Sequence, residues 1–507
     1  MLFITLFIAA FAILVGYVVT KIREHYNYWK RRNVAHDPPH WMLGNFKGLT
    51  ENRSIAECVQ TVYDKYKNTG PCFGFYWFTK PSAMVVDPQL IKQILIKDFA
   101  KFSDRGMFHN PEDDPLSGQL FNLDGPKWKN MRAQLSPAFT SGKMKLIFPL
   151  MEKLGQEVVR VFEENLTNTD IIEVADIMAR FTSDVIGSCA FGIETNSLKN
   201  PKSEFRTMGR RAMVEYRGGV LGVAFRLNFP QLARRWHLKE TIPEVEKYFM
   251  GLIRDTVNYR EENNIRCNDF MDMLIALKNN PLTKSENGEE LTKLSFGEIA
   301  AQAFLFLLAG YETSASSLAF ILYELACHED FQEKVRKEIS EVLDKHKQQF
   351  SYECMKEMTY LEQVMNETLR IHSIAPFLNR VALEDFPVPN HPAEFIIKKG
   401  MPVIIPTAAL QRDERYFSQP DVFNPENFSP ANMAERDSVL HMPFGDGPRN
   451  CIGLRFGKMQ IIVGLVLLLR NFKFSVCSET PVPMVYSKEG IILCPGKQGI
   501  PLKVEKI

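Results

Sequence analysis

The chain has 507 residues, of which 45% are hydrophobic and 24% charged, a composition typical of a globular protein with a large core. Its formal net charge of +1 argues against a protein that binds nucleic acid or another polyanion. The nine cysteines are an odd number without paired spacing, which fits a reducing compartment better than a disulfide framework.

Residues 1–20 form an apolar run without a charged side chain, long enough to span a bilayer as a helix. No basic side chain precedes this run, and several follow it: Lys21, Arg23, Lys30, Arg31 and Arg32. The positive-inside rule therefore predicts a transmembrane signal-anchor helix with the rest of the chain in the cytoplasm. A cleaved signal peptide is the alternative, although the Ala10-Phe11-Ala12 triplet lies inside the run and a basic segment before it is missing.

Residues 21–41 form a basic linker that ends in Asp37-Pro38-Pro39-His40-Trp41, where the prolines prevent a helix from continuing. We expect a proline-rich hinge here and a folded domain over residues 42–507. Residues 76–86 are rich in strand-forming side chains around Pro81, which predicts a small sheet near the start of that domain.

A helix is predicted around Trp128 and Arg132, which are four residues apart and project from one helix face. An indole N–H and a guanidinium in this arrangement can reach one anionic group together, and Arg105 is a candidate third partner. The alternative is an ordinary amphipathic helix with tryptophan in the core and arginine at the rim. Residues 106–125 are typical of a loop, with Phe108, Leu120 and Phe121 as its apolar points.

Apolar side chains gather again in residues 218–236, which are followed by basic side chains. Either a buried helix pair or a surface that touches a membrane fits this pattern.

Residues 296–327 form the longest uninterrupted helical pattern, which predicts a central, buried helix. Gly310 lies in its middle and destabilises a helix by about 1 kcal/mol relative to alanine, so a close helix contact or room for a small molecule must explain it. Thr313 can bond back to Ala309 and distort the helix.

Glu367 and Arg370 are three residues apart, so they share a helix face and can form a bidentate ion pair. A solvated surface pair of little energetic value is the alternative.

The run Phe444-Gly445-Asp446-Gly447-Pro448-Arg449-Asn450-Cys451-Ile452-Gly453 is rich in turn residues and opens into a helical pattern over residues 454–470. Cys451 therefore lies at a helix N-terminus, which favours the thiolate that a soft metal needs. A buried structural cysteine and a phosphate loop are the alternatives. The phosphate-loop spacings are not met, and a zinc site would need a second cysteine or histidine within a few residues.

This run matches F-x-x-G-x-R-x-C-x-G, and the chain thereby resembles the cytochromes P-450, with Phe444, Gly447, Arg449, Cys451 and Gly453 at every fixed position. The resemblance implies a mainly α fold with small β-sheets, forming a single heme-containing domain behind an N-terminal membrane anchor. It further implies heme b with Cys451 as its axial thiolate and O₂ as co-substrate. The cofactor-binding residues that it implies are Arg105, Trp128, Arg132, Arg380, Phe444, Arg449 and Gly453.

Other motifs agree with the family in the same order. Residues 309–313 match [AG]-G-x-[DE]-T, which implies that Gly310 makes room for O₂ and that Glu312 and Thr313 take part in catalysis. Glu367 and Arg370 match E-x-x-R. Residues 424–428 correspond to the segment P-E-R-F but carry asparagine at 427, so the usual third partner of the pair is in doubt. The residues expected at the substrate are Phe108, Leu120, Phe121, Ala309, Ile374 and Leu378.

The chain looks most like the insect family-six branch of microsomal enzymes. This implies an NADPH-dependent monooxygenase on the cytoplasmic face of the endoplasmic reticulum membrane, acting on lipophilic foreign compounds such as plant toxins or insecticides, or on insect hormones. Because no dinucleotide fingerprint occurs, electrons must come from a partner: an NADPH-cytochrome reductase, with cytochrome b5 as a second candidate. Basic residues that could steer an acidic reductase, or be merely solvated, are Lys127, Lys129, Lys143, Lys145 and Lys458.

Two rival functions are a thiolate-heme isomerase or dehydratase and a non-catalytic heme-binding protein. Enzymes of the first kind usually lose the acid and threonine pair, which this chain keeps at Glu312 and Thr313. The sequence does not name the substrate.

Overall fold

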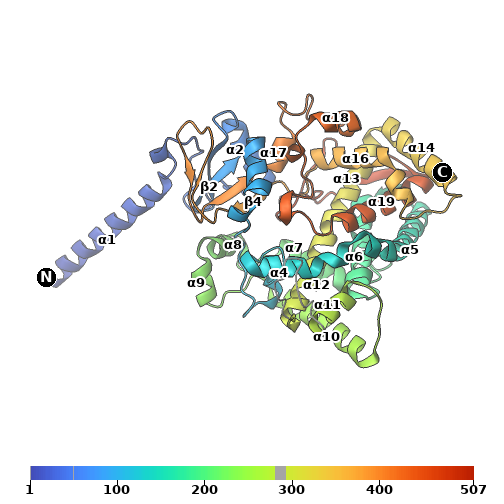
Figure 1. Cartoon of the computed structure of the whole chain (residues 1–507), viewed down its shortest axis with the longest axis horizontal. Coiled ribbons are helices and arrows are strands. Elements are labelled where there is room, and N and C mark those ends of the chain that lie inside the picture. The colour runs from blue at the N-terminus through green and yellow to red at the C-terminus, as the bar shows by residue number, and fades with distance from the viewer. Residues whose placement is uncertain (1, 50, 280–292) are drawn as a thin grey trace.

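A computed structural model describes residues 2–49, 51–279 and 293–507, so Met1 of the predicted anchor lies outside the described residues. Over these residues the chain forms a mainly helical body with small sheets, as predicted, and one long helix projects from it (Figure 1).

The projecting helix is α1, Leu2–Tyr26, which continues past the predicted end at Thr20 into the basic segment. Its large apolar side chains are exposed, with Phe3 at 88% and Phe7 at 70% of their full accessibility. At its inner end the Tyr76 hydroxyl donates to the carbonyl of Tyr26 over 3.0 Å. The helix is therefore fastened to the body before the chain reaches the prolines of the predicted hinge.

The largest sheet has the strand order β1-β2-β7-β4, in which β1 and β2 are antiparallel, β2 and β7 parallel, and β7 and β4 antiparallel. Its strands are β1 (Cys72–Trp77), β2 (Lys80–Val85), β4 (Leu378–Val381) and β7 (Pro402–Ile405). The predicted strand region over residues 76–86 is thus a hairpin, because Phe78 turns the chain with a φ of 52°.

Two smaller sheets complete the β-structure of the described residues. An antiparallel sheet of order β3-β9-β8 contains β3 (Ile171–Glu173), β8 (Phe472–Ser475) and β9 (Pro501–Lys506). A two-stranded sheet pairs β5 (Phe386–Pro387) with β6 (Ile396–Ile397).

The helices make up most of the body. They are α2 (Ile55–Tyr66), α3 (Pro88–Lys92), α4 (Gly125–Leu135), α5 (Ser141–Leu166), α6 (Val174–Ile186), α7 (Glu204–Val214), α8 (Gly219–Asn228), α9 (Pro230–Arg235), α10 (Pro243–Asn263), α11 (Phe270–Asn279), α12 (Phe296–Gly310), α13 (Glu312–Cys327), α14 (Glu329–Lys345), α15 (Cys354–Glu357), α16 (Thr359–Ile371), α17 (Thr407–Gln411), α18 (Pro430–Glu435) and α19 (Leu454–Asn471).

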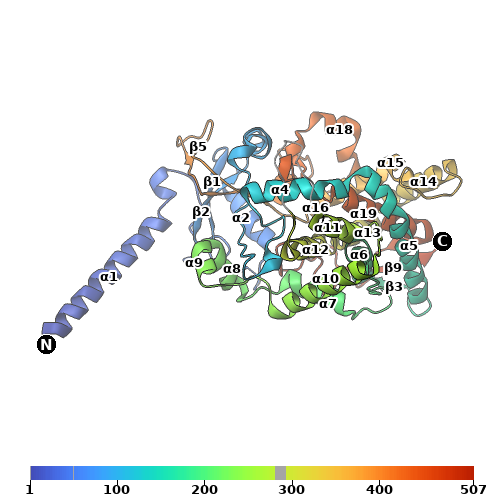
Figure 2. The same cartoon turned by 60° about the horizontal axis from the view of Figure 1, so that its bottom comes forward.

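The core is built around α12, α13 and α19. Figure 2 shows α7, α10 and α11 lying along α12, and almost every side chain of α13 is buried. Among the described residues one helical stretch, Phe296–Cys327, has the length and hydropathy of a membrane span, and 67% of its most apolar window is buried inside the protein. The predicted central helix is therefore a core element.

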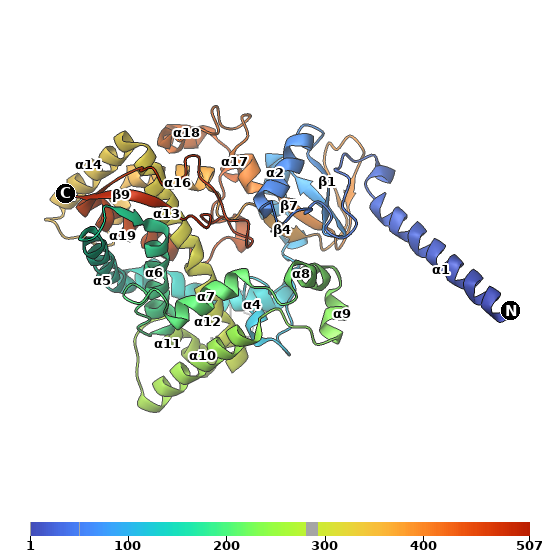
Figure 3. The same ribbon diagram turned by 180° about the vertical axis from the view of Figure 1, so that it is seen from behind.

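The predicted membrane-touching segment forms α8 and α9, which lie below the largest sheet on the same side of the body as α1 (Figure 3). Lys80 donates to the carbonyl of Leu227 over 2.7 Å and joins the sheet to α8. The exposed apolar side chains of this segment are Leu221, Phe229, Leu232 and Trp236. The buried-pair alternative does not describe this surface.

Candidate active site

The loop before α19 is held in a closed turn. Gly447 has a φ of 70°, and a Cβ there would lie 2.0 Å from the carbonyl oxygen of Leu95, so only glycine fits. The backbone N–H of Cys451 donates to the Phe444 carbonyl over 2.8 Å and brings the two ends of the motif together. Gly453 caps the helix, and a Cβ on it would lie 4.0 Å from the Cys451 sulfur. The predicted loop and helix are confirmed.

Opposing effects act on the pKa of the Cys451 thiol. Burial raises its pKa, whereas the Gly453 N–H and the guanidinium groups of Arg132 and Arg105 lower it. The N–H group at the start of α19 thus acts towards the thiolate, in the direction predicted from the helix N-terminus, while desolvation of the charged sulfur acts against it. A coordinating metal ion deprotonates such a thiol outright.

Arginines from separate parts of the chain converge beside this loop. Burial, followed by repulsion from Arg380, Arg449 and Arg132, lowers the pKa of Arg105 well below its ordinary value. Burial and Arg449 lower the pKa of Arg380 to about 10. Burial lowers the pKa of Arg449 to about 10 despite attraction by Asp124 and Asp104. We call Arg105, Arg132, Arg380 and Arg449 the arginine cluster.

The arginine cluster is tied to the cysteine loop by hydrogen bonds. Arg132 donates to the carbonyl and the side-chain oxygen of Asn450 over 2.7 and 2.8 Å. Arg105 donates to the Arg449 carbonyl over 3.1 Å. The Arg449 guanidinium lies 4.3 Å from the centre of the Trp128 indole. Trp128 and Arg132 thus meet the loop from one helix, α4, as their spacing predicted, with the indole stacked on Arg449.

The central helix is broken at Tyr311, between α12 and α13. The Thr313 hydroxyl donates to the Ala309 carbonyl over 2.5 Å, so the predicted distortion is confirmed. A Cβ on Gly310 would lie 2.3 Å from Cδ1 of Ile186 on α6. The close helix contact therefore explains the glycine, and the direction of that Cβ gives no support to the prediction that it leaves room for O₂.

Glu312 follows the break and is half-buried. Burial raises the pKa of its carboxyl, and the thiol of Cys494, Arg210 and Arg206 act in the opposite direction. Cys494 belongs to the loop before β9, far along the chain, so no local pattern predicts that it meets Glu312.

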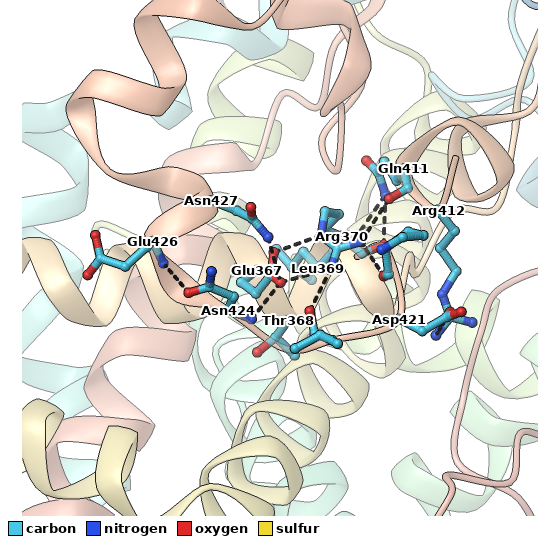
Figure 4. Close-up of polar contacts among 12 residues, drawn as sticks. Glu367, Thr368, Leu369, Arg370, Gln411, Arg412, Asp421, Asn424, Glu426 and Asn427 are labelled. Carbon is cyan, nitrogen blue, oxygen red and sulfur yellow. Dashed lines mark hydrogen bonds and ion pairs between the residues drawn. The ribbon is translucent and has the colours of Figure 1, made fainter. Parts of the chain in front are cut away.

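The Glu367 and Arg370 side chains are fully buried and form the predicted bidentate pair (Figure 4). Arg370 donates through Nε to Oε2 over 2.7 Å and through Nη2 to Oε1 over 2.8 Å. The amide of Asn427 donates to Glu367 Oε1 over 3.1 Å, as predicted for this departure from the motif. The pair is not unaided, however, because Asn424 N–H also donates to Oε1 over 2.8 Å.

Comparison with known proteins agrees with these features over nearly the whole chain. A family model described as "Cytochrome P450" matches residues 35–502. The chain belongs to the cytochrome P450 family. It is 54% identical over 500 residues to "Cytochrome P450 6a9" of Drosophila melanogaster, covering 99% of both chains. It is 43% identical over 501 residues to "Cytochrome P450 6A1" of Musca domestica, covering 98% of this chain and 97% of the relative. The predicted family-six branch is thereby confirmed.

A cytochrome P450 uses heme with thiolate ligation, and the arginine cluster fits that group. Within the described part of the chain, three buried guanidinium nitrogens of the cluster have no hydrogen-bond partner: Nε of Arg380, and Nε and Nη1 of Arg449. Asp124 attracts Arg105 and Arg449, and Asp104 attracts Arg449. The two propionate carboxylates of heme b would supply the missing acceptors and charge.

The residues predicted at the substrate have different surroundings. Phe108, Leu120 and Ile374 are buried, and the carbonyl of Ile374 accepts from Leu493 N–H over 2.9 Å. Leu378 lies beside the cysteine loop, where a Cβ on Gly445 would approach it to 3.9 Å. Ala309 is exposed although it belongs to a core helix. Their contact with substrate stays a prediction.

Phe121 differs from the others. The Arg105 guanidinium lies 4.2 Å from the centre of its ring, so the aromatic face is used to hold an arginine of the cluster.

All nine cysteines are free thiols in the structure. The reducing compartment stays a prediction.

Proposed function

We propose that Cys451 is the thiolate ligand of the heme in this monooxygenase, and that the arginine cluster binds the two propionates. The observation that carries the proposal is the set of buried guanidinium nitrogens without partners beside the cysteine loop. An unpaired buried donor costs about 1–3 kcal/mol and more when it is charged, so these groups call for an anionic ligand. Asp124 and Asp104 offset only part of their charge.

The bound heme supplies the chemistry of O₂ activation, in which two electrons from NADPH and two protons accompany transfer of one oxygen atom to the substrate and release of the other as water. The chain must bring those protons. The Thr313 hydroxyl donates its hydrogen bond to the Ala309 carbonyl, so the hydroxyl oxygen can accept a hydrogen bond from another group. Glu312 keeps a proton to higher pH than an ordinary carboxyl, because burial raises its pKa. We assign proton delivery to this pair.

The proposal places the protein on the endoplasmic reticulum membrane, with α1 as an uncleaved anchor and the body in the cytoplasm. Association with that membrane agrees with the resemblance to microsomal family members. The exposed apolar side chains of α1 and of α8 and α9 support the proposal. Protease added to sealed microsomes should digest the body and leave a product protected by the membrane only at the N-terminus. Protection of the body would reverse the orientation.

The electron donor in this proposal is a flavoprotein NADPH-cytochrome reductase. Of the basic residues considered, Lys145 pairs with Glu353 and Lys458 with Glu362, each over 2.5 Å. Lys127 and Lys143 are exposed and are the better candidates for steering an acidic partner. Cytochrome b5 is a second candidate donor.

We further propose lipophilic foreign compounds as the substrate class, since the candidate substrate positions carry apolar side chains. Membranes that contain the protein and the reductase should oxidise members of a lipophilic panel with matching NADPH consumption. An isomerase or a heme carrier would consume no NADPH with any of them.

The ligand assignment is tested by replacing Cys451 with serine in the full-length protein. The reduced carbon monoxide complex should lose its red-shifted Soret band, while the matched variant Cys477→Ser should keep it, because the Cys477 thiol is hydrogen-bonded to Thr480 and Pro501. A normal band in Cys451→Ser would refute the assignment.

A further inference from the structure

Arg436 is the C-cap residue that follows α18, and its side chain contacts the segment that carries Asn427. The guanidinium donates through Nη1 to the Asn427 carbonyl over 2.8 Å. Its centre lies 4.2 Å from the Phe417 ring and 5.7 Å from the Phe428 ring. A half-buried arginine with one hydrogen bond and two aromatic faces has a defined position, unlike a solvated surface cation.

Phe417 brings two cations together. The Arg370 guanidinium lies 4.8 Å from the same ring, so Arg370 and Arg436 share one aromatic partner. Burial lowers the pKa of Arg436, Glu367 raises it and Arg370 lowers it further, so both charges of the pair act on Arg436. Glu367 is therefore a carboxylate with two cations in its surroundings, one in direct contact and one beyond Asn427.

Hydrogen bonds lead from this site to the cysteine loop. Arg370 donates to the Gln411 carbonyl over 2.9 Å, and the Gln411 side-chain oxygen accepts from Met442 N–H over 3.3 Å. The Met442 carbonyl accepts from Gly445 N–H over 3.0 Å, which is the first turn of the loop that ends at Cys451. The Phe428 ring, under Arg436, also packs 4.4 Å from the ring of His441. A change at Arg436 can thus reach the loop along two routes.

We infer that Arg436 is a positioning residue for the heme loop. It adds a second positive charge near Glu367 through Asn427. It also holds residues 436–444 in the backbone path that determines the position of Cys451. An arginine at 427 would reach Glu367 directly, since the Asn427 amide already does so over 3.1 Å. Asparagine at 427 and arginine at 436 together therefore do what one cation at 427 would do. The inference rests on the proposed role of Cys451.

The test compares the full-length protein with Arg436→Ala, Arg436→Lys and the double variant Asn427→Arg/Arg436→Ala, each purified from membranes. Two quantities are measured: heme per polypeptide, and the fraction of the reduced carbon monoxide complex that absorbs at the red-shifted position. We expect a fall of at least threefold in that fraction for Arg436→Ala and a smaller fall for Arg436→Lys, which keeps the charge without the planar stack. The double variant should return to within twofold of wild type.

The matched control is Arg412→Ala. Arg412 lies in the same region and pairs with Asp421 over 3.6 Å, but its side chain is 35% exposed and makes no bond to Glu367 or Asn427 (Figure 4). It should leave both quantities unchanged.

A wild-type fraction in Arg436→Ala, or no recovery in a double variant that is folded by circular dichroism, would overturn the inference. If Arg436→Ala gives no folded protein, recovery of folding and heme in the double variant supports the inference, and failure of both refutes it. Failure of the ligand assignment looks different, because Cys451→Ser would then keep the red-shifted band.

Discussion

A variant without the charge of Glu367 should lose most of its bound heme. Glu367→Gln keeps the shape of the side chain but replaces one carboxylate oxygen with an NH₂ group. The carboxylate accepts four hydrogen bonds: from Nε and Nη2 of Arg370, from Asn424 N–H and from the Asn427 amide. Glutamine can accept at only one of its two terminal atoms, so at least one donor faces another donor.

The larger part of the cost is the charge of Arg370, which is fully buried and loses its counter-ion. Breaking a buried pair from one side costs about 3–5 kcal/mol. This is comparable with the whole stability of many domains, about 5–15 kcal/mol. Because Arg370 also holds the Gln411 carbonyl, the loss should reach the cysteine loop.

The assay is heme per folded polypeptide together with the midpoint of urea unfolding. Glu367→Gln and Arg370→Lys should lose most of their heme, whereas Asn427→Ala should cost only about 1–3 kcal/mol, the penalty of one unsatisfied polar group. Full heme retention in Glu367→Gln would refute the reasoning. Heme loss in Asn427→Ala as severe as in Glu367→Gln would show that the asparagine matters as much as the pair.

The other predictions concern separate parts of the site. Gly310→Ala should destabilise the protein by up to about 2 kcal/mol in urea unfolding. The added methyl group costs about 1–3 kcal/mol in overpacking, which outweighs the gain of about 1 kcal/mol in helix propensity. The double variant with Ile186→Val should recover the lost stability, and no recovery would assign the loss to another contact. His441, whose pKa burial lowers to about 3, stays neutral in the folded protein while the unfolded chain takes up a proton below about pH 6.5, so stability falls as the pH drops from about 6.5 towards 3. His441→Phe should remove up to about 1.4 kcal/mol per pH unit of that dependence, and equal slopes of unfolding midpoint against pH would contradict the assignment. Thr313→Ala should keep NADPH consumption but release more of it as hydrogen peroxide, and unchanged coupling to product would assign proton delivery to another group.

Features carried by short stretches of sequence could be predicted. The turn at Gly447 and the closure of the loop onto Cys451 follow from residue types within ten positions, and so does the bidentate pair of Glu367 with Arg370. In each case the spacing fixes which side chains share a face or a turn. The local pattern is then enough.

Features that depend on a neighbour far along the chain could not be predicted. Ile186 on α6 explains Gly310, and Cys494 near the C-terminus meets Glu312. No periodicity reports such contacts, because they arise only when the helices pack. The guanidinium groups of Arg132 and Arg105, which lower the pKa of Cys451, also come from segments far along the chain. Arg436 was not predicted as a site residue, because it lies outside residues 424–428, the motif segment that carries asparagine in place of the usual arginine.

The way α1 joins the body has a mechanical consequence. The helix reaches Tyr26 without a break, where its last carbonyls accept from Tyr76 of β1 and His25 lies 2.5 Å from the Thr79 carbonyl. In the proposed topology, with the apolar part of α1 in the bilayer, this helix would be a stiff connection between the membrane and the body rather than a flexible linker. The body would then keep one orientation relative to the membrane plane, with α8 and α9 facing the lipid. A compound dissolved in the bilayer would meet the same flank of the enzyme at every encounter, so delivery from the lipid phase would be set by the angle of this one helix.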